Sequence, residues 1–213
     1  GENGWTASIG AFVRQDDMLA VWPSDYPSDT VLDVMTYAGA NDVYNLSEGS
    51  GAGISYEKDG WSGSFVYVGA DASDAEAGLL TDEGADDITG QLAYVGEQYG
   101  LAVAYTASDS ASGDYDALGF NTWWVPEASG IWPSISAGVG FKDPDEGDDS
   151  NTWTLGFQWT DAFSDGNTLG LAIGSAEGWD EDSEGPLAYE AWYQIAVSDH
   201  IAVTPAVFVI EQN

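Results

Sequence analysis

Apolar and polar residues alternate with a period of two along most of the chain. Residues 153–159 carry Trp, Leu, Phe and Trp at every second position, with Thr, Gly and Gln between them. Strict alternation over such a length is typical of a β-strand with two unlike faces. The same pattern recurs in residues 5–13, 88–94, 99–105, 135–141, 169–173 and 187–197. Helical periodicity is absent, so the sequence predicts an all-β fold of about eleven strands, each near the length that crosses a bilayer.

The two faces of these expected strands differ in an informative way. One face carries large apolar residues, and the other carries Gly, Ala, Ser, Thr and an occasional Gln, with Lys142 and Glu190 as rare charges. A soluble β-sandwich as acidic as this chain would place Asp and Glu on its outer strand faces. Here the charges gather in the connections instead. Large apolar residues toward lipid and small polar residues toward water predict a transmembrane, antiparallel, up-and-down β-barrel.

The expected connections alternate between short and long. The short ones are residues 57–60, 96–98, 126–130, 161–166 and 198–199, and the long ones are residues 70–86, 107–114, 142–150 and 175–186. Short turns on one side and longer loops on the other are typical of bacterial outer-membrane barrels. Aromatic residues gather near the short turns, namely Trp61, Tyr99, Trp123, Trp124, Trp132 and Trp192. They fit an interfacial aromatic girdle and, equally well, ordinary strand aromatics.

Residues 14–49 interrupt this regular pattern with one long connection that contains Pro23 and Pro27. Its length is unusual for a structureless loop, and a short strand is expected around residues 31–37. Two placements stay open, a fold into the lumen that narrows a pore and an external flap. In the first, Arg14, Asp16 and Asp17 form a charged constriction.

Composition excludes several classes of function. The 213 residues include 37 acidic side chains and three basic ones, which excludes nucleic acid as a partner. Cysteine is absent, and no apolar stretch is long enough for a membrane-spanning helix. The single histidine, His200, lies beside an expected tight turn, so neither zinc sites nor Ser-His-Asp catalysis is supported and we expect no enzyme. No cofactor is expected.

Acidic residues concentrate in two of the long connections. The first contains Asp143, Asp145, Glu146, Asp148 and Asp149, and the second contains Glu177, Asp180, Glu181, Asp182 and Glu184. The first lacks the glycine and the final glutamate of an EF-hand loop. Weak divalent-cation binding that bridges to lipopolysaccharide is one interpretation, and a solvated charge run is the other.

Two stretches resemble the barrel region of cyanobacterial major porins, in the carbohydrate-selective OprB family whose members are often labelled iron-uptake porins. The first comprises residues 14–23 (RQDDMLAVWP) and 26–33 (YPSDTVLD). The second, residues 189–206, has an aromatic strand (YEAWYQ), a tight turn (SDHI) and a following VTPA. The resemblance extends over nearly the whole chain, although neither the family's surface-layer-homology domain nor its last strand is matched.

The resemblance implies an outer-membrane channel of roughly sixteen to eighteen strands that assembles as a homo-oligomer, a trimer. We therefore expect residues 1–213 to be one porin barrel domain and a fragment of a longer chain. The expected function is passive diffusion of small hydrophilic solutes and inorganic ions, iron among them, with a preference for cations. The alternative is a secreted acidic β-sandwich adhesin or carbohydrate-binding module. A role of the long loops as a phage receptor is also open.

Overall fold

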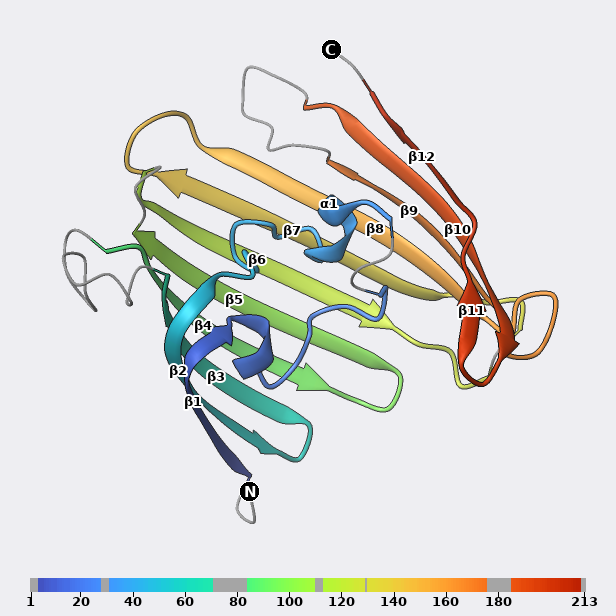
Figure 1. Ribbon diagram of the computed structural model, residues 1–213, viewed down its shortest axis with the longest axis horizontal. Coiled ribbons are helices and arrows are strands. Elements are labelled where there is room, and N and C mark those ends of the chain that lie inside the picture. The colour runs from blue at the N-terminus through green and yellow to red at the C-terminus, as the bar shows by residue number, and fades with distance from the viewer. Residues whose placement is uncertain are drawn as a thin grey trace.

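Twelve strands form one antiparallel sheet in the computed structural model of the chain, which describes residues 4–27, 31–70, 84–109, 113–128, 130–175 and 185–211 (Figure 1). The strands are β1 (Trp5–Arg14), β2 (Glu48–Lys58), β3 (Trp61–Gly69), β4 (Asp86–Val95), β5 (Tyr99–Asp109), β6 (Tyr115–Trp124), β7 (Ser134–Pro144), β8 (Ser150–Thr160), β9 (Thr168–Ser175), β10 (Leu187–Ser198), β11 (Ile201–Val203) and β12 (Ala206–Ile210).

Each strand from β2 to β10 pairs with the strands that precede and follow it in the sequence, so the topology is up-and-down. Helix is confined to a 3-10 turn, η1 (Asp16–Met18), and one short helix, α1 (Asp33–Thr36). The predicted all-β fold is therefore confirmed. Among the described residues, no helix has the length and apolar character needed to span a membrane.

The last strand position is shared by two short strands. β12 pairs with residues 188–192 of β10, and β11 pairs with residues 195–198 on the same side. Thr204 and Pro205 separate them, and proline has no backbone N–H to donate to the ladder. Eleven strand positions thus lie side by side across the sheet, as the alternation predicts.

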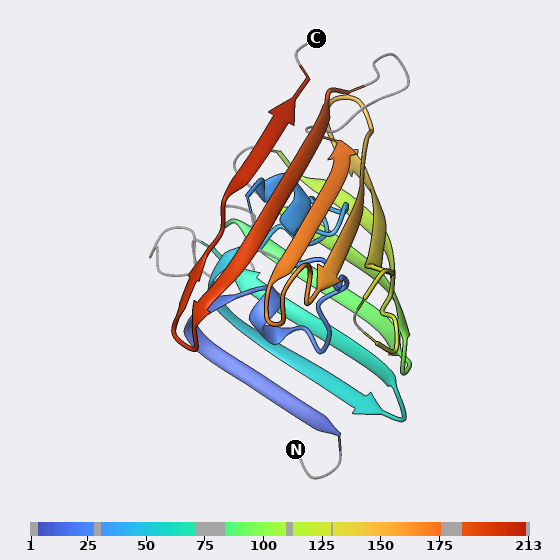
Figure 2. The same ribbon diagram turned by 90° about the vertical axis from the view of Figure 1, so that its right-hand side faces the viewer.

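The sheet is strongly curved, and its two faces differ as the sequence predicts. In β5, Leu101, Val103 and Tyr105 point to the convex face and are exposed, whereas Ala102 and Ala104 point to the concave face and are buried. Figure 2 shows the trough that this curvature creates and the segment between β1 and β2 lying inside it. The concave face is buried because that segment covers it.

The sheet is not closed into a barrel. Within the described residues, β1 pairs only with β2, and β11 and β12 pair only with β10, so both edges are open. The structure therefore shows an open, curved sheet and does not show the predicted closed barrel. The predicted alternation of connection lengths is also only partly right, because residues 125–133 at the short-turn end form a longer connection than residues 145–149 at the opposite end. The ladder between β6 and β7 extends through Pro144 and so includes Asp143, which the sequence pattern assigned to a loop.

Two of the aromatic residues expected in a girdle point inward instead. Trp123 and Trp192 are buried on the concave face. Each covers a glycine on a neighbouring strand, and a Cβ at Gly100 or Gly170 would come within 2.0–2.1 Å of the indole ring. A bulky side chain over a strand glycine fills the space that the missing side chain leaves. These two tryptophans therefore belong to the interior packing.

Candidate functional site

The long connection between β1 and β2, described at residues 15–27 and 31–47, crosses the concave face of the sheet, and we call it the strap. Figure 1 shows the strap in front of the central strands, with η1 near β1 and α1 near β9. The strap therefore lies on the concave face of the sheet, and its place in the lumen of a pore stays a prediction. The strand expected at residues 31–37 is also wrong, since α1 and a turn lie there. The wall strands beneath the strap are already paired on both edges, so they offer no backbone partner to a further strand.

Small polar side chains of the wall bind the strap backbone, one strand after another. The bonds to strap N–H groups are Ala20 N to Ser64 Oγ (2.8 Å) and Asp25 N and Tyr26 N to Ser136 Oγ (3.0 and 2.9 Å). The bonds to strap carbonyls are Thr106 Oγ1 to Val43 O (2.8 Å), Asn121 Nδ2 to Ala38 O (2.6 Å) and Thr152 Oγ1 to Gly39 O (3.0 Å). Each such bond contributes about 1 kcal/mol, and an unsatisfied buried group costs more. The Ser, Thr and Asn of the inner face therefore hold the strap.

The beginning of the strap is fixed by a completely buried glutamine, Gln15. Its Nε2 donates to Thr89 Oγ1 on β4 (2.6 Å) and to Val43 O (2.9 Å), and its Oε1 accepts from Leu46 N (3.2 Å). One side chain thus joins the two ends of the strap to the wall. Beside it, burial raises the pKa of Tyr44 well above its ordinary value, so this phenol stays neutral.

Backbone meets backbone where the middle of the strap passes β7. An added Cβ at Gly138 would lie 1.8 Å from Ala38 O and 2.4 Å from Asn121 Nδ2. On the strap side, Gly39 has a φ of 76°, which favours glycine, and its Cβ would lie 2.5 Å from Gly138 O. Two glycines that face each other therefore allow the strap to lie directly on the sheet.

The far part of the strap is bound to β10 by a buried carboxylate. Glu190 accepts a bond from the Tyr26 hydroxyl at Oε1 (2.6 Å) and from Leu32 N at Oε2 (2.8 Å). Trp192 Nε1 in turn donates to the Tyr26 hydroxyl (2.7 Å). Tyr26, Leu32, Met35 and Trp192 form an apolar cluster around these bonds with Ala172 and Ala188.

Two basic residues beside the strap form ion pairs with aspartates of the strap. Arg14, at the end of β1, makes a two-bond pair with Asp16 (2.6 and 2.7 Å). Lys142 reaches inward from β7 to Asp42 (2.9 Å) and lies 4.2 Å from the centre of the Tyr115 ring. The strap sequence itself contains no Lys, Arg or His. These two pairs therefore compensate Asp16 and Asp42, and the described residues show no ion pair for Asp17 or Asp25.

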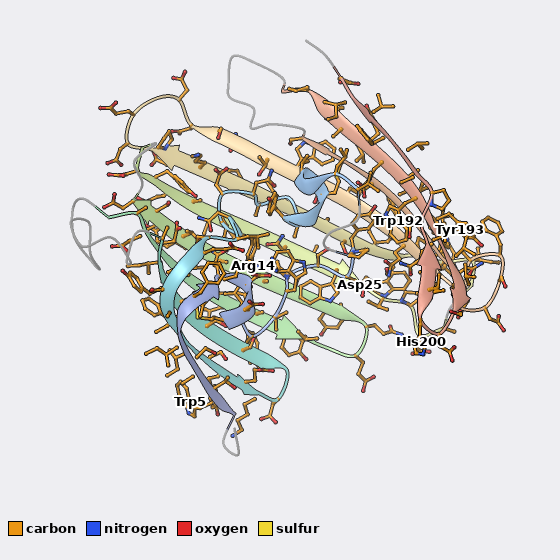
Figure 3. The ribbon with its side chains drawn as sticks, viewed as in Figure 1. Trp5, Arg14, Asp25, Trp192, Tyr193 and His200 are labelled. Carbon is orange, nitrogen blue, oxygen red and sulfur yellow. The ribbon has the colours of Figure 1, made fainter. Side chains whose placement is uncertain are left out.

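Two of those carboxylates are exposed to solvent to different degrees along the first half of the strap. Asp17 is exposed and Asp25 is half-buried, and no ion pair to either is found within the described part of the chain. Figure 3 shows Arg14 where β1 enters the strap and Asp25 farther along it. Of the predicted constriction, Asp17 is thus an uncompensated charge, whereas Arg14 and Asp16 neutralise each other. Sequence reasoning missed Asp25, which carries no pattern beyond its place after Pro23.

The predicted acidic loop lies at the end of the sheet opposite the short turns. Asp143 lies next to the last residue of β7, and the strand is followed by Asp145, Glu146, Asp148 and Asp149. All five side chains are exposed. Asp180, Glu181 and Asp182 lie outside the described residues, as do Glu177 and Glu184. No group of three or more His, Cys, Asp or Glu side chains with metal-binding geometry occurs in the described part. His200 is exposed in the turn before β11.

The convex face carries aromatic rows at both ends of an apolar band. Near the short turns, Trp5 packs on Tyr56 (4.7 Å between ring centres) and Trp61 packs on Tyr94 (5.0 Å). At the opposite end, tyrosine hydroxyls donate to carboxylates in three pairs, Tyr67 with Asp86, Tyr105 with Asp116 and Tyr189 with Glu211. Between the rows lie exposed apolar residues, including Ile54, Phe65, Leu92, Leu101, Val103 and Phe120. The convex face therefore carries an exposed apolar band with aromatic side chains at both ends.

Comparisons with known proteins found no matching protein family, no matching curated protein and no matching solved structure. The resemblance of residues 14–33 and 189–206 to porins therefore stays a prediction.

Proposed function

We propose that this chain forms part of the wall of an outer-membrane β-barrel, and that the strap narrows a water-filled, cation-favouring pore inside it. The observation that carries the proposal is the pairing of an apolar convex face with a polar concave face that holds an internal segment. Leu92 on the convex face is 68% exposed, and Phe65 is 54% exposed. A sheet that exposes such a band to water would aggregate, whereas lipid covers it without cost.

The aromatic rows support a membrane as the partner. Trp and Tyr favour the interface between lipid and water because their rings are apolar and their N–H or O–H groups are polar. Tyr67, Tyr105 and Tyr189 each direct a hydroxyl to a carboxylate at one end of the band. In the proposed barrel the acidic loops lie beyond the polar side of the interface, where lipopolysaccharide lies in an outer membrane.

The direction of the edge strands indicates how the barrel is completed. All neighbouring pairs are antiparallel across eleven positions, so the edge at β11 and β12 runs in the same direction as β1. Direct pairing of the two edges would be parallel, and outer-membrane barrels are antiparallel throughout. An odd number of further strands closes the wall, and we assign them to the same polypeptide outside residues 1–213. A second copy with its loops on the same side would again pair in parallel.

The strap determines the width and the ion preference of the proposed pore. It lies against the wall over β3 to β10 and fills part of the trough, so solutes pass on its free side. We assign Asp17 and Asp25 to that side, since Asp17 is exposed, Asp25 is half-buried, and neither has a basic partner in the described residues. Negative charge in a narrow passage concentrates cations and excludes anions. Small hydrophilic solutes and inorganic ions are the proposed cargo, and trimeric assembly follows only from the resemblance to porins.

Neutralising the strap carboxylates should weaken cation preference. In the double variant Asp17→Asn, Asp25→Asn, we expect the cation-to-anion permeability ratio to fall about two- to threefold, because two charges near the passage are lost while shape is kept. The reversal potential under a salt gradient measures this ratio. Asp59→Asn, in the exposed turn between β2 and β3, is the matched control and should leave the ratio unchanged. An unchanged ratio in the double variant would remove these residues from the passage.

Removing Arg14 should change selectivity in the opposite direction. Arg14→Ala leaves Asp16 without its partner, so we expect cation preference to rise rather than fall. The same reversal-potential measurement applies. A fall in cation preference would mean that Arg14 itself does not face the passage and acts only on the strap's position.

Membrane fractionation tests the barrel itself. The full-length protein should extract from outer membranes only with detergent, and its folded form should migrate differently from the heated form on SDS gels. The rival, a secreted acidic adhesin, predicts a protein that stays soluble without detergent. The single described sheet disfavours a sandwich, which needs two packed sheets.

A further inference from the structure

Glu190 stands apart from the other side chains that hold the strap. The Ser, Thr and Asn anchors are neutral, and most of them bind one backbone group each. Glu190 is 4% exposed, and its two oxygens accept bonds from two separate points of the strap, Tyr26 and Leu32. Burial of a carboxylate is costly unless hydrogen bonds compensate it. A neutral side chain would be cheaper to bury here, so the carboxylate points to a task that needs two strong acceptors.

The hydrogen bonds of Glu190 attach the strap to β10 at two points. One bond is made at Tyr26 and the other at Leu32, and Trp192 adds a third bond through the Tyr26 hydroxyl. Beyond Leu32, α1 packs its Met35 into the same cluster. The remainder of the strap has its own anchors, because Asn121 and Thr152 bind Ala38 and Gly39. Loss of Glu190 therefore frees one part of the strap and leaves the rest in place.

We infer that Glu190 is a latch that holds residues 26–27 and 31–37 of the strap against β9 and β10, and that it thereby keeps the passage open and steady. Glu190 is a positioning residue, since it acts through the strap and does not touch the solute. The inference about the passage rests on the proposed pore. The inference about the latch rests only on the contacts of Glu190, Tyr26 and Leu32. An experiment can therefore contradict the inference about the passage without contradicting the inference about the latch.

Amide hydrogen exchange on the full-length protein tests the latch directly. In Glu190→Ala, exchange of a peptide covering residues 31–37 should accelerate about tenfold or more, because the Leu32 amide loses its acceptor and local opening becomes easier. A peptide covering residues 38–46 should be unchanged. Glu190→Gln, which keeps one acceptor oxygen, should give a smaller acceleration. Asp116→Asn, which alters a similar tyrosine–carboxylate pair on the convex face, should give none.

Tyr26→Phe provides a second route if Glu190→Ala does not fold. It keeps the carboxylate and removes one of its two donors, so we expect an intermediate acceleration in residues 31–37. Combined with Glu190→Gln it should add little, because both act on one set of bonds. Unchanged exchange in residues 31–37 for folded Glu190→Ala or Tyr26→Phe would overturn the latch.

Single-channel recording tests the consequence for the passage. Glu190→Ala channels should flicker between conductance levels at an unchanged melting temperature of the wall, and Glu190→Gln should partly restore steady currents. Accelerated exchange with steady currents would keep the latch and overturn its effect on the passage. If neither the parent protein nor any variant conducts, the proposed pore fails, while the exchange result still decides the latch.

Discussion

Replacing Gly138 with alanine should lift the middle of the strap from the sheet and destabilise the protein by about 1–3 kcal/mol. The added methyl would lie 1.8 Å from Ala38 O, a distance that no rearrangement of a side chain can relieve, because the neighbour is backbone. The hydrogen bond from Asn121 Nδ2 to Ala38 O would lengthen or break as the strap moves. Denaturant unfolding and amide exchange of residues 38–46 measure both effects.

Gly90→Ala is the matched control for this variant. Gly90 lies in β4, and no atom lies within 4 Å of the position that its Cβ would occupy. Alanine loses less backbone entropy than glycine on folding, so this change should be neutral or slightly stabilising, by up to about 1 kcal/mol. The two substitutions are chemically identical and should differ in sign. Equal effects would mean that the strap does not rest on Gly138.

A charge in the middle of the convex band should cost far more than one at its edge. We expect Val103→Arg to destabilise the protein in a bilayer by about 2–4 kcal/mol, because position 103 lies at the centre of β5 and faces lipid in the proposed barrel. Refolding into lipid vesicles, followed by the folded fraction against denaturant, gives the free energy. The large effect arises only if lipid covers this face.

Tyr99→Arg is the corresponding control, since Tyr99 begins the same strand in the aromatic row near the short turns. Arginine at the interface costs about 0–1 kcal/mol. Val103 is 42% exposed and Tyr99 is 50% exposed, so exposure alone predicts similar, small effects for both variants in water. A difference between them therefore reports depth in a membrane, and its absence would contradict the lipid-facing assignment.

The sequence predicts the sheet well because alternation is a local property. Each strand shows its two faces within its own residues, and the antiparallel order follows from short turns such as Asp59–Gly60. Strand ends are less predictable. Asp143 and Pro144 look like loop residues, yet they continue the ladder opposite β6, because pairing depends on the neighbouring strand as well as on local composition.

The site is harder to predict because its contacts join residues far apart in the sequence. Gln15 and Thr89, or Tyr26 and Glu190, share no local pattern that would show their bonds. The small polar residues of the inner face suggest a wide and unselective lumen when the strands are considered alone, whereas the structure shows that the strap uses many of them. One signal was available: Glu190 is a carboxylate in the inward phase of a strand whose other inward residues are uncharged. Charge in such a position indicates a partner.

Conductance of the full-length protein in a planar lipid bilayer is the most direct measurement of the central claim. With purified protein under a salt gradient, we expect stepwise, ohmic currents and a reversal potential that favours cations, moved toward zero by Asp17→Asn, Asp25→Asn. A protein that stays soluble without detergent and produces no current would contradict the membrane barrel and the pore together.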